Sequence, residues 1–135
     1  MGWIYKNKKY DPKNLDPKVI YGFVYEITNL DNRRKYIGKK FFWETKSYQK
    51  NLKRKKRKVE SNWRDYYGSS DVLLEDLVDI GKDRFDRRIL RLCKTKSECA
   101  YFEAKYQFEN KVLESEEYYN SWIMVKVRKA HLTKL

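Results

Sequence analysis

The stretch YGFVYEITNLDNRRKYIGKK at residues 21–40 carries Tyr25, Tyr36, Gly38 and the lysine pair Lys39 and Lys40 on either side of a turn-rich segment. A phenol has a pKa of about 10, so Tyr25 or Tyr36 could accept a proton at neutral pH only beside cations that favour its anion. Lys39, Lys40 and the basic residues of the 50–64 segment are candidates for those cations. The simpler interpretation is that the two rings pack as a cross-strand pair, since aromatic residues favour sheets.

A glutamate falls on an unexpected face of the last predicted helix. At about 100° per residue, Glu98, Lys105 and Glu109 share one face, which we expect to be exposed, and Glu103 lies nearly opposite Lys105. An acid on a largely apolar face is costly unless it is paired, hydrogen-bonded or bound to a cation. Glu103 is therefore expected either in an internal salt bridge or as a ligand of a hard ion such as Mg²⁺, which one carboxylate can hold with substrate phosphates and water.

Secondary structure predicted from periodicity and capping residues positions these side chains. The predicted order β-β-α-β-α comprises strands at 19–28 and 35–43, a helix at 69–81, a strand at 87–93 and a helix from 95 to about 112. The first two strands alternate apolar residues around a turn-rich cluster at 29–34, which predicts a hairpin. Gly38 inside a strand indicates a bulge or a close backbone approach. Serine and glycine bound the first helix, and Thr95 with Glu98 has capping-box spacing at the second.

The predicted fold class is α/β (α+β), a small domain with a three-stranded antiparallel sheet flanked by helices. At 135 residues the chain fits one domain. Residues 1–18 contain both prolines and are expected to form an irregular arm. The domain is expected to span 19–127, with a further strand possible at 122–127 and a short tail at 128–135.

Basic residues exceed acidic residues by a wide margin. The chain has 32 Lys and Arg against 19 Asp and Glu, giving a net charge of +13, which indicates a polyanionic partner. An insertion at 46–64 follows the second strand, and seven of the nine residues at 50–58 are basic. It could be a solvated or disordered loop, or a nucleic-acid contact. No apolar run approaches the roughly 18 residues of a membrane-spanning helix, so no membrane partner is expected.

Cysteine and histidine are too few for two common kinds of site. Cys93 and Cys99 cannot form a disulfide framework, and with His131 they cannot assemble a zinc site of four ligands. Both cysteines are expected to be reduced core residues. The N-terminus shows neither a signal peptide nor a myristoylation motif, so an intracellular protein is expected.

The motifs FVY (23–25) and YIG (36–38) resemble those of the GIY-YIG nucleases, and more closely those of the short phage-encoded Seg-type homing endonucleases. In that family the two motifs occupy successive strands, followed by a helix with a basic residue and a later helix with a glutamate. The segment SNWRDYYGSSDVLLEDLVDIGKDRF also resembles the Seg-type group. The likeness covers roughly residues 20 to 120. Gly22 is one position too early for the first-motif glycine, and Phe23 stands in its place.

The resemblance implies a metal-dependent endonuclease that hydrolyses DNA phosphodiester bonds with Mg²⁺ or Mn²⁺. It makes Glu103 the metal ligand, and it makes Tyr25 the group that accepts a proton from the attacking water or orients that water. Tyr36 would support this geometry. The catalytic cation would be Arg57 or Lys39, which would also lower the pKa of the phenol.

Further roles follow from the same resemblance. Gly38 and Asn120 would support the site. The expected DNA contacts are Lys40, Lys50, Lys53, Arg54, Lys55, Lys56, Lys58 and Arg64. The partner would be DNA, bound by a monomer or a transient homodimer, in the cytoplasm of a phage-infected bacterial host. The alternative function is a non-catalytic, basic nucleic-acid-binding protein, which explains the charge and the aromatic content equally well.

Overall fold

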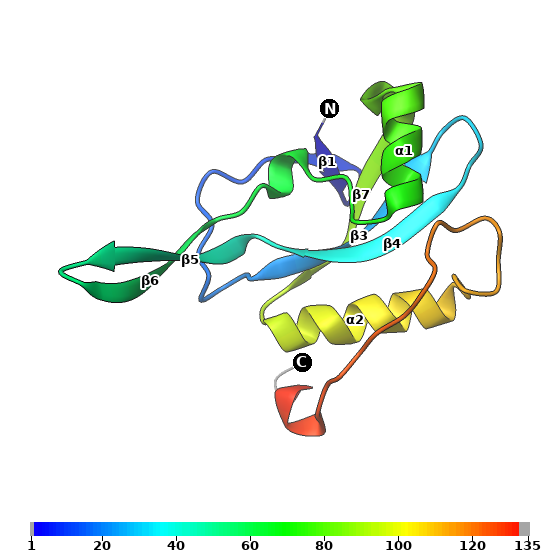
Figure 1. Ribbon diagram of the computed structural model, residues 1–135. Helices are drawn as coiled ribbons and strands as arrows, with labels where there is room; N and C mark the ends of the chain where they lie inside the picture. The colour runs from blue at the N-terminus through cyan, green and yellow to red at the C-terminus, as the bar shows by residue number, and fades with distance from the viewer. Residues whose placement is uncertain (1, 133–135) are drawn as a thin grey trace.

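A mixed five-stranded sheet forms the centre of the computed structural model, which describes residues 2–132 (Figure 1). Its strands, in the order β2-β1-β7-β3-β4, are β1 (Trp3–Tyr5), β2 (Lys8–Tyr10), β3 (Gly22–Asn29), β4 (Lys35–Phe41) and β7 (Phe85–Cys93). β1 pairs parallel to β7, and the other pairs are antiparallel. The α+β class is confirmed. The predicted three-stranded antiparallel sheet is wrong, because β3, β4 and β7 are only part of a mixed sheet that also includes β1 and β2.

The two additional strands come from the segment that we expected to be irregular. Trp3 is 1% exposed, and its ring centroid lies 4.9 Å from that of Phe23 and 5.3 Å from that of Tyr25. Its indole nitrogen donates a 2.7 Å hydrogen bond to the carbonyl of Trp63. Burial of one large aromatic side chain thus fixes β1 against β7, although its short sequence carries no usable periodicity.

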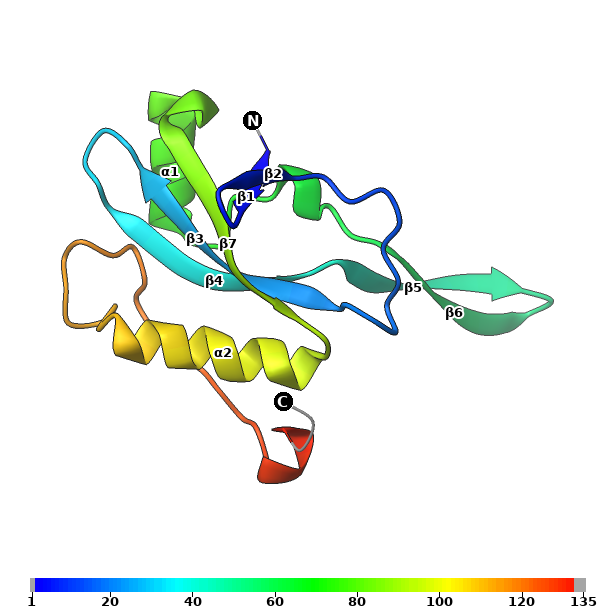
Figure 2. The same ribbon diagram turned by 180° about the vertical axis from the view of Figure 1, so that it is seen from behind.

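Two helices cover opposite faces of this sheet (Figures 1 and 2). Residues that alternate along β3 separate the two cores: Phe23, Tyr25 and Ile27 pack with helix α1 (Asp71–Ile80). Val24 points the other way and packs with Cys93, Cys99 and Phe102, the last two of which lie on helix α2 (Lys96–Glu109). Both cysteines are free and buried, as predicted.

The predicted capping residues are confirmed at both helices. Ser70 Oγ accepts a hydrogen bond from the Leu73 amide at 3.3 Å, and Thr95 Oγ1 accepts one from the Glu98 amide at 3.1 Å. The prediction of an exposed Glu98 is wrong. Glu98 is 7% exposed because its carboxylate turns back to the chain entering the helix, where it accepts from the Lys94 amide at 3.4 Å.

The basic insertion is a regular β-hairpin, so it is not the solvated or disordered loop that was one of its two possible interpretations. Strands β5 (Trp43–Lys50) and β6 (Lys53–Glu60) form a separate two-stranded sheet that projects from the body (Figures 1 and 2). The two turn residues, Asn51 and Leu52, have φ values of 51° and 62°. Positive φ at both positions is the conformation of a tight hairpin turn whose twist matches that of the strands.

The chain after α2 runs along the free edge of β4. The Lys35 amide donates to the Glu117 carbonyl at 2.8 Å, and the Tyr119 amide donates to the Lys35 carbonyl at 2.7 Å. The strand that we expected at 122–127 is absent from the described residues, and this segment is irregular. Short 3₁₀ turns occur at Trp63–Asp65, Lys82–Arg84 and Lys129–Leu132. No helix among residues 2–132 is long and apolar enough to cross a membrane.

Candidate functional site

The two motif tyrosines meet over a glycine on the neighbouring strand. β3 and β4 pair Tyr25 with Gly38 and Ile27 with Tyr36, so the phenols are diagonal neighbours that pack across the two strands, as the simpler interpretation predicted. Their ring centroids lie 6.2 Å apart. A Cβ atom at Gly38 would lie 2.5 Å from Tyr25 Oη and 2.9 Å from Tyr36 Cε2. The close approach at Gly38 is therefore made by aromatic rings, and only glycine leaves space for both.

The segment before α1 completes the surroundings of the phenols. Tyr36 Oη and Ser69 Oγ form a 3.2 Å hydrogen bond. Tyr66 packs edge-on against Tyr25 with ring centroids 6.0 Å apart. Gly68 has φ +90°, and a Cβ atom there would lie 3.3 Å from Tyr25 Oη. Sequence reasoning missed these three residues, although a glycine after two tyrosines in YYGSS was the available signal.

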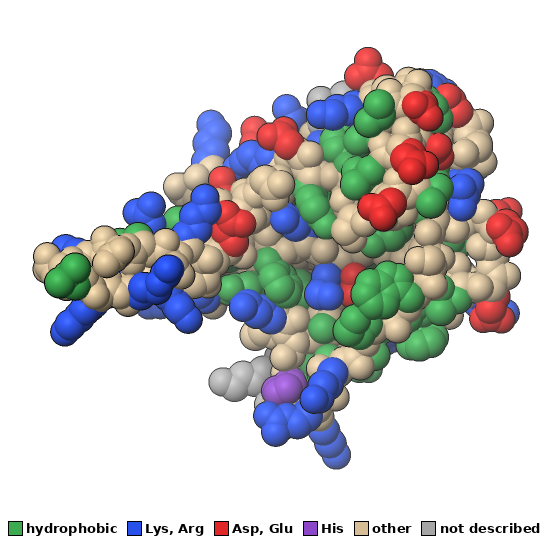
Figure 3. All heavy atoms as spheres, in the orientation of Figure 1, with side chains coloured by type: hydrophobic (Ala, Val, Ile, Leu, Met, Phe, Trp, Pro, Cys, Tyr) green, Lys and Arg blue, Asp and Glu red, His purple; other side chains and the backbone are tan. Residues whose placement is uncertain are grey.

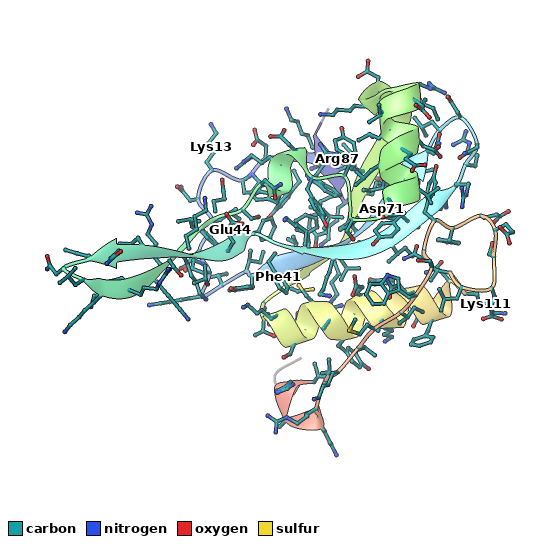
Figure 4. The ribbon with its side chains drawn as sticks, viewed as in Figure 1. Lys13, Phe41, Glu44, Asp71, Arg87 and Lys111 are labelled. Carbon is teal, nitrogen blue, oxygen red and sulfur yellow. The ribbon has the colours of Figure 1, made fainter. Side chains whose placement is uncertain are left out.

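A buried arginine holds this segment in place. Arg87 is 3% exposed, and its Nη1 donates hydrogen bonds to the carbonyls of Arg64 at 3.0 Å and Tyr66 at 2.9 Å. Its guanidinium lies 4.7 Å from the Trp3 ring centroid and 4.2 Å from that of Tyr67. Figure 4 shows Arg87 reaching from β7 toward the segment between the hairpin and α1. Arg87 therefore positions Tyr66 beside the motif tyrosines.

Glu103 points toward the sheet and forms an ion pair there. Its Oε1 accepts from Lys39 Nζ at 3.1 Å, and the exposed fractions of the two side chains are 14% and 32%. The prediction that Glu103 faces away from water is confirmed, and of its two expected partners the structure shows the salt bridge. Burial raises the pKa of the Glu103 carboxyl, and the neighbouring ammonium of Lys39 opposes that rise. A cation at this position thus favours the charged carboxylate.

These side chains open into one cavity of about 420 Å³ between the sheet, the base of the hairpin and α2. It brings together four of the five predicted catalytic residues, namely Tyr25, Tyr36, Lys39 and Glu103, with Lys40, a predicted DNA contact. The other lining residues are Phe41, Trp43, Glu44, Ser61, Ser69, Gln107, Trp122 and Met124. Phe41 and Glu44, labelled in Figure 4, lie where β4 continues into the hairpin. The cavity therefore combines aromatic walls with two ammonium groups and a partly buried carboxylate.

The surroundings of the two phenols raise the pKa of both. Burial, together with Tyr66 and Tyr36, raises the pKa of Tyr25 well above its usual value of about 10. Burial also raises the pKa of Tyr36, although the hydrogen bond with Ser69 opposes it. The expectation that Lys39 or Arg57 lowers the pKa of a phenol is therefore wrong for this arrangement. Tyr25 and Tyr36 can act here as hydrogen-bonding groups.

Two predicted basic residues lie outside this cavity. Arg57 is on β6, where its guanidinium lies 5.6 Å from the Tyr48 ring centroid, and it is not among the lining residues. Arg64 forms an ion pair with Asp11 at 2.6 Å and donates to the Pro12 carbonyl at 2.8 Å. Of the basic residues weighed for a catalytic role, Lys39 is the one that the fold places beside Glu103.

Asn120 supports the strand that carries the second motif. Its Oδ1 accepts from the Ile37 amide at 3.1 Å, and its Nδ2 donates to the Ile37 carbonyl at 2.8 Å. Gln107 Nε2 donates to the same carbonyl at 2.9 Å. Both side chains are buried, so they satisfy the outer backbone groups of β4 between Tyr36 and Gly38.

The remaining predicted DNA contacts fall into two groups. Lys40 lies on β4, with its ammonium 4.2 Å from the Tyr66 ring centroid, and burial lowers its pKa. The others lie on the exposed hairpin, whose blue side chains are prominent in Figure 3, whereas acidic side chains gather over α1. These hairpin residues are Lys50, Lys53, Arg54, Lys55, Lys56 and Lys58.

Residues 2–132 contain no cluster of three or more His, Cys, Asp or Glu side chains that could hold a metal ion alone. The cavity instead offers the partly buried carboxylate of Glu103, and the carboxylate of Glu44 lines it at the base of the hairpin. This donor set fits Mg²⁺, which keeps several waters and is commonly held by one or two carboxylates with substrate phosphates. It does not fit a structural zinc site, which needs four protein ligands.

Comparison with known proteins places the chain within a family. A family model described as "Putative endonuclease segE, GIY-YIG domain" matches residues 3–123, and the chain belongs to this GIY-YIG family. It is similar to the "Putative endonuclease segE" of Enterobacteria phage T4, with 32% identity over 101 residues that cover 75% of this chain and 40% of that protein. The chain thus spans two fifths of the length of that relative. No solved structure matches it.

Proposed function

We propose that this protein is a metal-dependent endonuclease that hydrolyses phosphodiester bonds of DNA, of the phage homing type. One observation carries the proposal: a single cavity holds both motif phenols, Lys39 and the partly buried Glu103. Family membership supports it, since the family description names an endonuclease. The net charge of +13 supports a polyanionic substrate.

The residues of the cavity have distinct roles in this proposal. When bound, a Mg²⁺ or Mn²⁺ ion held by Glu103 supplies a fixed positive charge for a non-bridging phosphate oxygen and for the leaving 3′ oxygen. Lys39 keeps the Glu103 carboxylate charged and faces the same phosphate. Tyr25 and Tyr36 orient the attacking water through their hydroxyl groups. As the water oxygen bonds to phosphorus, the bond to the 3′ oxygen breaks, and that oxygen ends with the proton of the water.

The proposed DNA contacts extend from the cavity along the hairpin. Lys40 lines the cavity, and the cations of β5 and β6 continue outward from Trp43 and Glu44, which also line it. If the protein makes six to ten phosphate contacts, its affinity for DNA should fall by a factor of about 10³ to 10⁵ when salt rises from about 50 to about 200 mM. A flat salt profile would show that these cations do not contact DNA. A chain with one such site cleaves both strands by sequential nicking or as a transient dimer.

Glu103→Gln tests the catalytic role with little change in shape. It should abolish Mg²⁺-dependent nicking and cutting of supercoiled plasmid while DNA binding persists, because the amide no longer offers an anionic ligand. Glu109→Gln is the matched control, since Glu109 is exposed on the same helix and lies outside the cavity. Cleavage by Glu103→Gln at the wild-type rate would remove the assignment.

The alternative function, a non-catalytic basic nucleic-acid-binding protein, is favoured by the same charge and by the hairpin. It gives no reason for the Glu103–Lys39 ion pair and both motif phenols to line one cavity. The plasmid assay separates the two functions. Binding without cleavage, at any concentration of Mg²⁺ or Mn²⁺, would support the alternative.

A further inference from the structure

The β5–β6 hairpin presents two exposed faces. Of its residues, only Trp43 and Val59 near its base are not exposed. An isolated two-stranded hairpin is at best marginally stable, and like charges directly opposite each other destabilise it. Here Lys50 pairs with Lys53, and Lys46 pairs with Arg57. These charges weaken the hairpin in the free protein, so their advantage lies in binding an anionic partner.

The two faces differ in chemistry. Directly paired residues share a face, and successive residues alternate between faces. The cationic face consists of the pairs Lys46–Arg57, Tyr48–Lys55 and Lys50–Lys53. The mixed face consists of the pairs Thr45–Lys58, Ser47–Lys56 and Gln49–Arg54. At the base of the hairpin the first face also carries the pair Glu44–Val59, and the second carries the pair Trp43–Glu60. Beyond the base, one face is cationic apart from a tyrosine, whereas the other pairs each cation with a neutral side chain that both donates and accepts hydrogen bonds.

This difference matches the two kinds of contact that proteins make with duplex DNA. Phosphates need cations and carry no sequence information directly. Base edges in the major groove display donors and acceptors, which glutamine reads at adenine, arginine at guanine, and serine or threonine at either. The Gln49–Arg54 pair brings two such side chains together near the tip of the hairpin.

We propose that the hairpin enters the major groove of duplex DNA with its mixed face on the base edges, and so reads sequence. The major groove, about 12 Å wide, admits a two-stranded β-ribbon, whereas the minor groove is only about 6 Å wide. The long side chains of the cationic face reach the phosphates of the groove walls. The inference rests on the proposed function in taking DNA as the partner, and it adds base recognition to the phosphate contacts expected from sequence.

The hairpin also fixes where the recognised bases lie. Glu44 lines the cavity, and Gln49 follows five residues later on the same strand. At about 3.3 Å per residue, the Gln49–Arg54 pair lies about 17 Å from the cavity wall. Since successive base pairs rise by about 3.4 Å, that distance corresponds to about five base pairs. The base preference should therefore lie about five base pairs to one side of the cut.

Two double variants with equal loss of charge test the proposal. Arg54→Ala with Lys56→Ala changes the mixed face, and Lys53→Ala with Lys55→Ala changes the cationic face of the same strand. Duplexes are selected from a randomised pool and their affinities are measured in EDTA, so that binding is read without cleavage. Thermal unfolding checks that the body of each variant is intact.

The two variants should differ in kind. Specificity is measured as the affinity for selected duplexes divided by the affinity for random duplexes. In the mixed-face variant this ratio should fall by about 10-fold or more, because the base contacts are removed. The cationic-face variant should weaken binding to all duplexes alike and lower the salt slope by about 2, with the selected sequences unchanged. If the wild-type protein does not cleave DNA but the two variants still show these different binding defects, the proposed function is overturned and the inference on base recognition stands.

Three results would overturn the inference itself. The first is that the wild-type protein selects no sequence from the pool. The second is that both variants weaken binding equally and leave the selected sequences unchanged, as expected of a purely electrostatic contact. The third is that single-stranded DNA competes as well as the duplex, since a single strand has no groove to enter.

Discussion

Gly38→Ala tests whether the close contact between β4 and the two phenols is needed for activity. The added methyl carbon would lie 2.5 Å from Tyr25 Oη, whereas ordinary contact begins at 3.4 Å. To reach ordinary contact distance, the Tyr25 hydroxyl or the β4 backbone must therefore move by about 0.9 Å. Tyr25 is 1% exposed and packed against Trp3 and Phe23, so it cannot move freely.

The expected consequence is large for catalysis and smaller for stability. A displacement on the order of 1 Å near the reacting atoms costs about 100-fold in rate. Overpacking a core position costs about 1–3 kcal/mol in the free energy of unfolding. The rate is measured by single-turnover cleavage of supercoiled plasmid with Mg²⁺, at a temperature where denaturant titration shows the variant folded.

Gly2→Ala serves as the control, because its new methyl group would meet only the flexible end of Lys9, at 3.4 Å. It should cleave at the wild-type rate. The reasoning is refuted if folded Gly38→Ala also cleaves at that rate, since the phenol positions would then not matter.

Two further predictions concern the neighbours of the phenols. Lys39→Met removes the cation that opposes the raised pKa of Glu103, so that pKa should rise further. Because activity requires the carboxylate form, the acid limb of the rate–pH profile should move to higher pH. An acid limb that stays in place would contradict this role. Asn120→Ala removes both hydrogen bonds to the Ile37 backbone and should cost about 1–3 kcal/mol in the free energy of unfolding. Amide exchange at Ile37 should become faster, whereas exposed Asn110→Ala should leave it unchanged.

Local patterns in the sequence were enough for the central elements. Alternation around a turn cluster predicted the pairing of β3 with β4, and Ser70 and Thr95 marked both helix starts. Helical periodicity placed Glu103 on the face opposite Lys105, where the structure finds its ion pair with Lys39. These features depend on residues close together in sequence, or on one repeating period.

The missed features depend on contacts between distant residues. β1 exists because Trp3 packs on residues of β3 and bonds to Trp63, and a short strand has no period of its own to show. Glu98 was assigned to the exposed face by periodicity, but its carboxylate bonds to the Lys94 amide. The β5–β6 hairpin was not predicted for two reasons. Its charge density is also typical of a solvated loop, and its turn, Asn51–Leu52, lacks the glycine that commonly marks such turns.

The pairing of the chain near Tyr119 with Lys35 has a consequence for self-association. An unpaired edge strand is a template on which a second copy can add its own strand. Along β4 that position is already taken by hydrogen bonds within the chain. At the opposite end of the sheet, β2 is three residues long and begins with two exposed lysines. Two copies that meet on one duplex would therefore not be joined by a continuation of the five-stranded sheet across both molecules.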